Sequence, residues 1–484
     1  MTSSSFLRGW VKQSTLVVAL FSVVVILTPI AARYLHYDNL LIGGEVYYNA
    51  RIAEGIAQKG IMLYDRLTFS GEHYSLSAFN VLLAALGSRS RIYLALLVMP
   101  FVLGPLSAVL LYLWLGCFRI KRHVRIVAAL LFAASPAFLH TFCSSSIEAA
   151  GVFTLLLGLL LATRGGFANR LAALLALMIS ALFGPLNMVI SLFTLNYYAS
   201  RANKSRAMLW VMMLSLAVFS IFFYAFWCIH LNQIPRISFD PVRALLLSDL
   251  GSETGVGVFS VVLAAIGFIY CWRERAHLRL FYWALLIVLA YNTVSLNYYI
   301  YISLFIAPFS AFGIEAVLTR EWDIETIKKF TLLLILCGLS FSTISYMHRL
   351  VWFRPSREEA YSLRWLGSYD SYNSKEARLV LSEPGYGSMI QYFSGLPIVI
   401  TPKSSDVIIN DTRTMFHSRN LNRTTSIMER YSVAYVWLGE GARERIWKKD
   451  DEGLLFLLRN NKTFKNIYSD NGIEIWEVMQ PEEP

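Results

Sequence analysis

Long apolar segments are the feature that most constrains this chain. About eleven of them approach or reach the ~17–25 residues that a helix needs to cross a bilayer, and a soluble fold has no use for so many. Hydrophobic residues make up 56% of the chain and charged residues only 15%, against about 25% charged in soluble proteins. We therefore predict a mostly α, polytopic membrane helical bundle. Its predicted spans are residues 14–32, 92–115, 124–142, 147–162, 170–183, 185–199, 207–229, 255–272, 280–296, 299–318 and 330–347.

Loop charges predict how these segments are threaded. Residues 170–183 and 185–199 are short for single spans and could instead form one long helix. With two helices, the basic loops collect on one side of the membrane, and the short loops around Ser144, Pro185 and Leu296 on the other side lack Lys and Arg. One long helix would remove this bias. The positive-inside rule therefore predicts two helices, a cytoplasmic N-terminus and an external C-terminus, as in a multi-pass protein of the plasma membrane.

The predicted domains are a membrane domain, residues 1–348, and an external domain, residues 349–484. Two long external loops, residues 34–91 and 230–254, interrupt the membrane domain, and loops of this length are usually functional or disordered. The C-terminal part alternates strand-like and helical patterns, which predicts an α/β domain. The predicted strands are residues 378–382, 397–401, 432–438 and 472–478, and the predicted helix is residues 441–461.

The net charge of +11 does not indicate a nucleic-acid-binding surface. Residues 349–484 contain 18 basic and 18 acidic residues. The excess of positive charge therefore lies in residues 1–348, which contain 25 basic and 14 acidic residues. There the basic residues belong to loops that set membrane orientation. No GxxxxGK(S/T) motif is present, and the eight histidines form no HExxH pair. We therefore expect no nucleic-acid partner, no ATP hydrolysis on this chain and no zinc site.

The first long external loop begins with an amphipathic segment within residues 41–60. Its small and apolar side chains recur at helical spacing on one face: Val46, Ala50, Ala53 and Ala57. Gly60 is suited to end this helix, and Glu45 lies in its first turn, where the helix dipole favours a carboxylate. We predict a helix in the membrane surface. Glu45 is then either a capping carboxylate or a base at the membrane boundary, near cations that bind a lipid phosphate.

This segment resembles the first external loop of the GT-C superfamily, the membrane glycosyltransferases that use polyprenyl-linked donors. That superfamily includes the oligosaccharyltransferase catalytic subunits, and its archaeal members are the most similar in motif style. There, an acidic residue after the first span orients or deprotonates the acceptor, and a Tyr-Tyr-x-x-Arg-x-Ala-type helix often follows. Glu45, Tyr47, Tyr48, Arg51 and Ala53 match this pattern. The resemblance implies Glu45 as the catalytic residue, Arg51 as a donor phosphate ligand, and Tyr47 and Tyr48 as substrate-binding residues.

Asp65 lies in a second stretch of the same loop that resembles the superfamily's Tyr-Asp-containing segment, which implies a substrate-binding role. Glu148 matches the Glu of an Asp-x-Glu metal motif of oligosaccharyltransferases, with Ser146 in place of the Asp. Asp249 lies in an acidic segment similar to one in archaeal relatives. The resemblance implies Glu148 and Asp249 as ligands of a divalent cation, Mg²⁺ or Mn²⁺. The carboxylate of the motif's Asp is missing, because Ser146 stands in its place. The alternatives are an interfacial position for Glu148 and a helix-capping cluster around Asp249.

Tyr386 and Gly387 match the last two residues of the Trp-Trp-Asp-Tyr-Gly motif with which oligosaccharyltransferases bind the acceptor sequon. The match implies substrate binding by Tyr386. The Trp-Trp-Asp part is absent here, which argues against transfer of sugar to Asn in a peptide.

The resulting hypothesis is a membrane glycosyltransferase with a polyprenyl (dolichyl) phosphate-linked donor and a glycan, lipid or protein acceptor on the external face. Arg51 would bind the donor phosphate together with Arg236 or Arg243, two cations of the second long loop. Glu45 would remove the proton from an acceptor hydroxyl, and direct attack would invert the anomeric carbon. The alternatives are a non-catalytic binder or flippase of lipid-linked sugars, a degenerate scaffold, or an oligosaccharyltransferase proper.

Overall fold

The computed structural model describes residues 3–37, 40–61, 64–69, 77–202, 206–231, 247–252, 254–274, 278–292, 298–373, 378–401, 404–447, 449 and 451–479. The chain divides into two compact units. Unit 1 comprises Met1–His36, Ser77–Phe79 and Leu94–Trp352, and unit 2 comprises Tyr37–Leu76, Asn80–Tyr93 and Phe353–Pro484.

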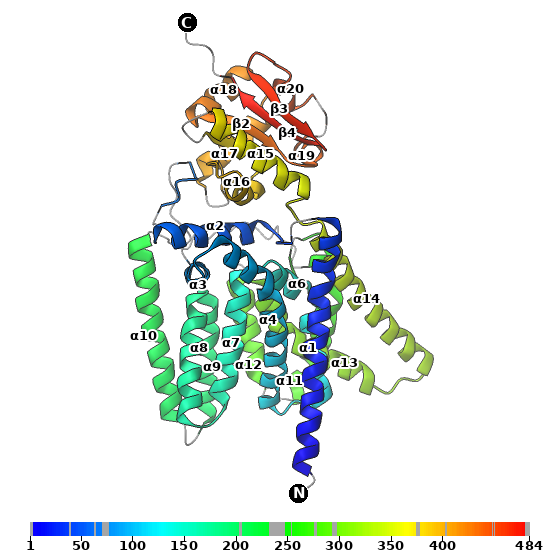
Figure 1. Ribbon diagram of the computed structural model, residues 1–484. Helices are drawn as coiled ribbons and strands as arrows, with labels where there is room; N and C mark the ends of the chain where they lie inside the picture. Colours follow the sequence, from blue (N-terminus) through cyan, green and yellow to red (C-terminus); the bar gives the residue numbers. More distant parts are fainter. Residues whose placement is uncertain are drawn as a thin grey trace. The chain divides into compact units, whose positions relative to one another are not determined.

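Unit 1 is built from helices, most of which run side by side (Figure 1). The turns η1 (Gly116–Phe118) and η2 (Ser248–Leu250) lie between the longer elements, whereas most of the short helix α3 (Ala78–Ala84) and the start of α4 are assigned to unit 2. The helices are α1 (Ser3–His36), α4 (Arg89–Leu115), α5 (Arg122–Ala133), α6 (Pro136–Cys143), α7 (Ile147–Thr163), α8 (Phe167–Leu182), α9 (Pro185–Arg201), α10 (Arg206–Leu231), α11 (Val258–Glu274), α12 (Arg279–Asn292), α13 (Tyr299–Thr319) and α14 (Glu325–Val351).

The predicted span at residues 124–142 is not one straight helix. It is divided into α5 and α6, which are bent by 58° relative to each other. Ser135 is the N-cap of α6, and its Oγ accepts a hydrogen bond from the Phe138 N–H. Pro136 follows at the first helical position, where its missing N–H costs nothing, but it cannot continue a helix that arrives from α5. Apolar content is continuous across the break, which is why hydropathy alone predicted one element.

The two short helices predicted around residues 183–185 are confirmed as separate elements. Helix α8 ends at Leu182 and α9 begins at Pro185, so the helical conformation is interrupted at Phe183 and Gly184. The two helices then pack against each other and against α7 and α10, as Figure 1 shows. A single continuous helix could not bring the two halves into contact.

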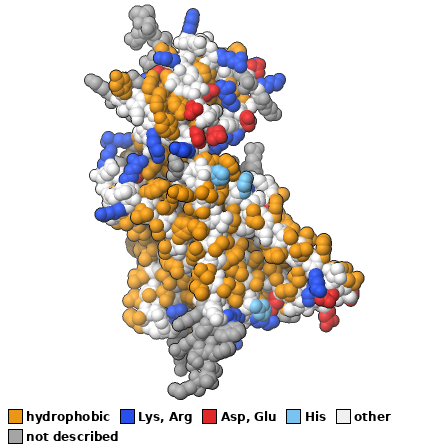
Figure 2. Space-filling model, turned by 45° about the vertical axis from the view of Figure 1, so that its right-hand side comes forward, with side chains coloured by type: hydrophobic (Ala, Val, Ile, Leu, Met, Phe, Trp, Pro, Cys, Tyr) orange, Lys and Arg blue, Asp and Glu red, His pale blue; other side chains and the backbone are white. Residues whose placement is uncertain are grey.

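Among the described residues, five helices are long and apolar enough to cross a membrane, or six if α5 and α6 form one span. Large apolar side chains project outward along them, for example Phe222 on α10 and Phe341 on α14, which are 73% and 67% exposed. Figure 2 shows the hydrophobic surface that such side chains form over these helices. So much exposed apolar surface is favourable only in lipid. The protein is therefore an integral, multi-pass membrane protein, and the count of eleven spans stays a prediction.

Helix α13 forms the core of unit 1 and is buried over most of its length. It packs closely against α11 through two glycines, Gly267 and Gly313. A Cβ at Gly267 would clash with the carbonyl oxygen of Phe309, and one at Gly313 with that of Leu263. The absence of side chains at these two positions allows the backbones to approach, as is usual between helices in membranes.

Unit 2 contains a four-stranded sheet in the order β1-β2-β4-β3. Strand β1 (Leu379–Leu381) pairs parallel with β2 (Val433–Leu438), while β4 (Ile473–Val478) pairs antiparallel with β2 and with β3 (Phe464–Asp470). The surrounding elements are α15 (Arg357–Asn373), η4 (Pro384–Tyr386), α16 (Gly387–Phe393), α17 (Asp406–His417), α18 (Leu421–Arg430), α19 (Ala442–Ile446) and α20 (Gly453–Leu458).

Two sequence-based expectations for this part are wrong in detail. The segment predicted as a strand at residues 397–401 forms only isolated bridges through Ile398. The helix predicted at residues 441–461 is two short helices, α19 and α20, because its polar middle does not continue the apolar pattern. Strand β3 was not predicted at all, although Asn471 and Gly472, with φ of 46° and 75°, form the kind of turn that joins hairpin strands.

Part of the first long loop belongs to unit 2. Ile398 accepts a hydrogen bond from the Phe69 N–H (3.0 Å) and donates its own N–H to the Leu67 carbonyl (3.0 Å). The ring of Phe69 packs edge-on against Tyr431, with 4.7 Å between centroids. Unit 2 thus includes this loop as well as the segment from Phe353 onward, and the predicted division of the chain at residue 348 stays a prediction. The loop joins unit 2 through pairing between distant segments, which hydropathy does not detect.

Candidate functional site

The candidate site begins with α2 (Gly44–Lys59), the helix predicted from the first-loop pattern. Gly43, at φ 87°, precedes its first turn, and Gly60, at φ 77°, ends it with an N–H bond to the Ile56 carbonyl, as predicted. Glu45 lies exposed in the first turn, where the helix dipole stabilises the carboxylate form. A carboxylate that is exposed to solvent is accessible to the hydroxyl of an acceptor.

The N-terminus of α2 lies beside the turn that carries Tyr386. The Gly43 N–H donates to the Arg354 carbonyl oxygen over 3.2 Å. A Cβ placed on Gly44 would lie 3.5 Å from the Gly385 carbonyl oxygen and 3.6 Å from Met389 Cε. Two sequence-predicted site segments, around Glu45 and around Tyr386, are thus neighbours within unit 2.

Tyr47 and Tyr48 face different surroundings. The Tyr47 ring is only 1% exposed and packs on Tyr392 and Phe393, with ring centroids 5.2 and 5.1 Å away. Its hydroxyl donates to the Leu41 carbonyl oxygen over 3.1 Å. Tyr48 is half-buried under the Arg51 guanidinium, 5.6 Å from its ring centroid. The contacts of Tyr47 hold α2 against α16. Substrate binding by Tyr47 and Tyr48 stays a prediction.

Arg51 and Asp65 bind each other. Arg51 Nη1 donates to Asp65 Oδ1 over 2.9 Å, and Nη2 pairs with Oδ2, so the interaction is bidentate. The two side chains are only 11% and 4% exposed. Asp65 Oδ1 also accepts from the Leu67 N–H (3.0 Å). This bond stabilises the turn in which the Leu67 carbonyl oxygen accepts from the Ile398 N–H. The Arg51 charge is therefore already compensated, and this geometry favours a structural tie between α2 and the loop over a free phosphate ligand.

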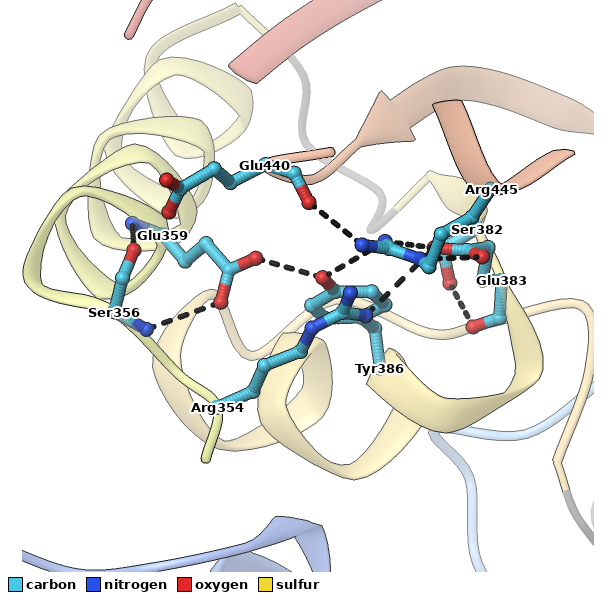
Figure 3. Close-up of polar contacts among 8 residues, drawn as sticks. All are labelled: Arg354, Ser356, Glu359, Ser382, Glu383, Tyr386, Glu440 and Arg445. Atoms are coloured by element: carbon cyan, nitrogen blue, oxygen red, sulfur yellow. Dashed lines mark hydrogen bonds and ion pairs between the residues drawn. The ribbon is translucent and has the colours of Figure 1, made fainter. Parts of the chain in front are cut away.

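Figure 3 shows the network around Tyr386. Its hydroxyl donates to Glu359 Oε1 over 2.7 Å, while Glu359 Oε2 accepts from the Ser356 N–H (3.1 Å). Ser356 Oγ in turn accepts from the Glu359 N–H (3.1 Å). This reciprocal arrangement is a capping box at the start of α15. Tyr386 itself is 1% exposed, so its ring is part of the core of unit 2 and its hydroxyl orients a buried carboxylate.

Two arginines complete this network. Arg445 Nη2 donates to Glu383 Oε2 (2.7 Å) and reaches the Tyr386 hydroxyl (3.3 Å), while the Arg354 guanidinium lies 4.4 Å from the centroid of the Tyr386 ring. Sequence analysis did not single out Glu359 or Arg445. The spacing Ser-x-x-Glu before α15 was a usable signal for Glu359, whereas Arg445 is brought in only by the fold.

Burial raises the pKa of Glu359 above its ordinary value of 4.5, and the bonds from Tyr386 and Ser356 and the charge of Arg354 only oppose this effect. The folded protein thus holds the Glu359 proton more tightly than the unfolded chain does. The stabilisation is complete below the unfolded pKa and is lost as the pH rises through the folded pKa. Glu359→Gln keeps a capping side chain and cannot ionise. We expect the melting temperature of wild type relative to this variant to fall as the pH is raised from about 4 to 8.

Thermal unfolding of the detergent-solubilised protein across this pH range checks the expectation. Glu358→Gln removes the neighbouring carboxylate on the same turn of α15 and serves as the matched control for loss of one acidic side chain at this position. Parallel curves for wild type and Glu359→Gln would contradict a proton held by Glu359.

The predicted metal ligands belong to unit 1. Asp249 Oδ2 accepts from the Val258 N–H at the start of α11 (2.7 Å), and Oδ1 accepts from Ser342 Oγ on α14 (2.6 Å). Glu148 lies half-buried in the first turn of α7. Among the described residues, no group of three or more His, Cys, Asp or Glu side chains converges on a metal position. The described donor set therefore does not fit a divalent cation, and metal binding stays a prediction.

Arg349, at the end of α14, was missed by sequence analysis. Its Nη1 and Nη2 donate to the carbonyl oxygens of Ser252 (2.8 Å) and Ser248 (2.9 Å). Its guanidinium also covers the Tyr346 ring at 4.8 Å. It thus anchors the turn that carries Asp249. The predicted phosphate ligands Arg236 and Arg243 lie outside the described residues.

The fold resembles several solved structures. The archaeal oligosaccharyltransferase AglB from Archaeoglobus fulgidus, in complex with an inhibitory peptide and a dolichol-phosphate, matches with a TM-score of 0.61 and 14% identity, over 99% of this chain and 75% of that chain. The arabinofuranosyltransferase AftD from Mycobacteria matches with a TM-score of 0.61 and 16% identity, over 98% of this chain and 40% of that chain.

ArnT from Cupriavidus metallidurans, bound to undecaprenyl phosphate, matches with a TM-score of 0.51 and 11% identity, over 95% of this chain and 97% of that chain. By sequence, no family model and no curated protein matches. All three solved structures are of GT-C glycosyltransferases, so this chain has the GT-C fold. Identities this low establish the fold and not the substrates.

Proposed function

We propose that this protein is a glycosyltransferase that takes a sugar from a polyprenyl-phosphate carrier and transfers it on the extracytoplasmic face of a cell membrane. The proposal includes about eleven spans, a cytoplasmic N-terminus and an external α/β C-terminal domain. The observation that carries it is an exposed carboxylate, Glu45, in the first turn of the helix that follows the first long apolar helix. The GT-C fold supports it, because two solved relatives in fold contain dolichol-phosphate or undecaprenyl phosphate.

The proposed reaction needs one base and one charge-stabilising group. A Glu45 carboxylate oxygen takes the proton of an acceptor hydroxyl as that oxygen attacks the anomeric carbon. The bond between this carbon and the phosphate oxygen breaks, and polyprenyl phosphate leaves. Attack from the side opposite the leaving group inverts the anomeric configuration. No step is assigned to a metal ion.

The leaving phosphate needs cationic partners. Arg236 and Arg243 remain the proposed ligands from the second long loop. Arg51 is a weaker candidate, because Asp65 already occupies both of its terminal nitrogens. In this proposal Arg51 and Asp65 instead hold α2 in position, so that Glu45 is presented at a fixed place.

The test is transfer from radiolabelled polyprenyl-phosphate sugars by the purified protein in lipid nanodiscs. We expect a new glycosidic bond of inverted configuration, identified by NMR of the product. A peptide with an Asn-x-Thr sequon is included as an acceptor, and it should not be glycosylated, since Trp-Trp-Asp is missing before Tyr386. Binding of lipid phosphate without transfer from any donor would instead indicate a binder, flippase or scaffold.

A further inference from the structure

Unit 2 contains a cavity of about 610 Å³ that the proposed chemistry does not use. Its wall is formed by parts of α2, the start of α4, the N-terminal half of α15, the end of α16 and the turn between β3 and β4. Its volume falls in the range of roughly 300–1,000 Å³ that is usual for small-molecule sites. Segments of unit 2 that are distant in sequence therefore border one space of ligand size.

Aromatic rings with a guanidinium at each end form one side of this cavity. The rings of Tyr47, Tyr392 and Phe393 lie within 5.1–5.2 Å of one another, centroid to centroid. Arg89 lies 4.7 Å from the centroid of Tyr392, and Arg364 lies 5.2 Å from that of Phe393. Stacking on a ring fixes the plane of a guanidinium group, and its N–H edge can then donate hydrogen bonds in that plane.

The charges around the cavity do not favour a strong anion. Glu358 and Asp470 line it together with Arg89, Arg357 and Arg364, and Glu54 Oε1 lies 3.4 Å from Arg89 Nε, so three carboxylates oppose three guanidinium groups. Among the described residues, no acidic side chain forms an ion pair with Arg364. A polyphosphate would meet two carboxylates at this wall, and an acyl chain would leave several charged groups without partners.

A polyhydroxylated ligand satisfies all of these groups. Sugar hydroxyls donate to carboxylates and accept from guanidinium groups, and planar side chains can bind neighbouring hydroxyls in pairs. The C–H face of a sugar ring is apolar and fits an aromatic surface such as that of Tyr392 and Phe393, which the buried Tyr47 ring supports from behind. The mixture of rings with both signs of charge matches an uncharged oligosaccharide better than a lipid or a phosphate.

We propose that this cavity binds the sugar chain of the acceptor at a distance from the reacting hydroxyl, so that the acceptor is an oligosaccharide. The inference rests on the proposed transferase function. Tyr47 and Glu45 are two positions apart on α2, and such positions do not share a helix face. The cavity thus lies on a different face of α2 from Glu45, and as a subsite it binds sugars beyond the one that reacts and selects acceptors by chain length.

Direct binding tests the subsite without any donor. Neutral oligosaccharides of mannose, glucose, galactose, arabinose and N-acetylglucosamine, short and long, are titrated onto the purified full-length protein in nanodiscs. We expect a long oligosaccharide to bind and Arg364→Ala to weaken it by about tenfold, as for loss of one charge-assisted hydrogen bond. Arg364→Lys keeps the charge, loses the planar stack and should restore binding only in part.

Arg419→Ala is the matched control, because Arg419 also stacks on a ring of unit 2, that of Phe456 at 5.3 Å, and does not line the cavity. Melting temperatures confirm that each variant is folded. Inorganic pyrophosphate is the competing probe: binding of pyrophosphate that depends on Arg364, with no oligosaccharide bound, would make the cavity an anion site and overturn the proposal. Equal oligosaccharide affinity in wild type and Arg364→Ala would overturn it as well.

The two proposals fail in different ways. If sugar transfer occurs but no oligosaccharide of the panel binds, the subsite is wrong and the transferase stands. If oligosaccharides bind in an Arg364-dependent way and no donor is turned over, the subsite stands and the transferase is wrong. In the active enzyme, Arg364→Ala should raise KM for long acceptors and leave KM for short ones unchanged.

Discussion

Glu45→Gln should lower the rate of sugar transfer by roughly 10²–10⁴-fold, the usual cost of removing one general base. Glutamine keeps the size of the side chain and its ability to accept a hydrogen bond, but it cannot take a proton at neutral pH. Because Glu45 is exposed at the helix N-terminus, the substitution should change the melting temperature little. The loss should appear in kcat, measured with radiolabelled donor at saturating acceptor.

Asp406→Asn is the matched control for this substitution. Asp406 is also an exposed carboxylate in the first turn of a helix, α17, so the change removes the same charge from an equivalent helix position. It should leave transfer unchanged. If Glu45→Gln is as active as wild type, Glu45 is not the base, although the transferase itself would stand.

Breaking the ion pair of Arg51 and Asp65 should destabilise the protein by about 3–5 kcal/mol, since removal of one partner leaves an uncompensated buried charge. Both side chains are nearly inaccessible, at 11% and 4% exposure, so solvent screens this pair little. The Arg51→Ala and Asp65→Ala variants should each show a lower unfolding free energy in detergent. The double variant should lose much less than the sum of the two.

The comparison of the two single variants with the double variant also distinguishes between two possible roles of Arg51. If Arg51 is a structural tie, Asp65→Ala should impair activity and stability to an extent similar to Arg51→Ala. If Arg51 binds the donor phosphate instead, Arg51→Ala alone should weaken donor binding, measured by titration of polyprenyl phosphate. Additive losses of stability would show that the pair is not coupled.

Local signals explain what could be predicted. The helix from Gly44 to Lys59 follows from residues that repeat every three to four positions, and its end follows from Gly60. The break between α8 and α9 follows from Gly184 and Pro185, together with the loop charges. In each case the decisive residues lie within one or two turns of the feature that they determine.

Other features needed contacts between distant residues. Arg51 is 14 residues from Asp65, and Arg445 is 62 residues from Glu383, so neither pair produces a periodic pattern. The bend between α5 and α6 did have a local signal, Ser135 and Pro136, which the continuous apolar run concealed. Strand β3 is largely polar and exposed, and only the Asn471-Gly472 turn marks it.

By itself, the sequence determined that this chain spans a membrane, because apolar segments of this length have no stable place in water. It also determined the helix that carries Glu45. Only the tertiary structure decided which polar residues bind each other, as Arg51 binds Asp65 and Tyr386 binds Glu359. The physical reason is that apolar periodicity is set by neighbouring residues, whereas the partner of a buried charge is set by which distant segments the fold brings within hydrogen-bond distance.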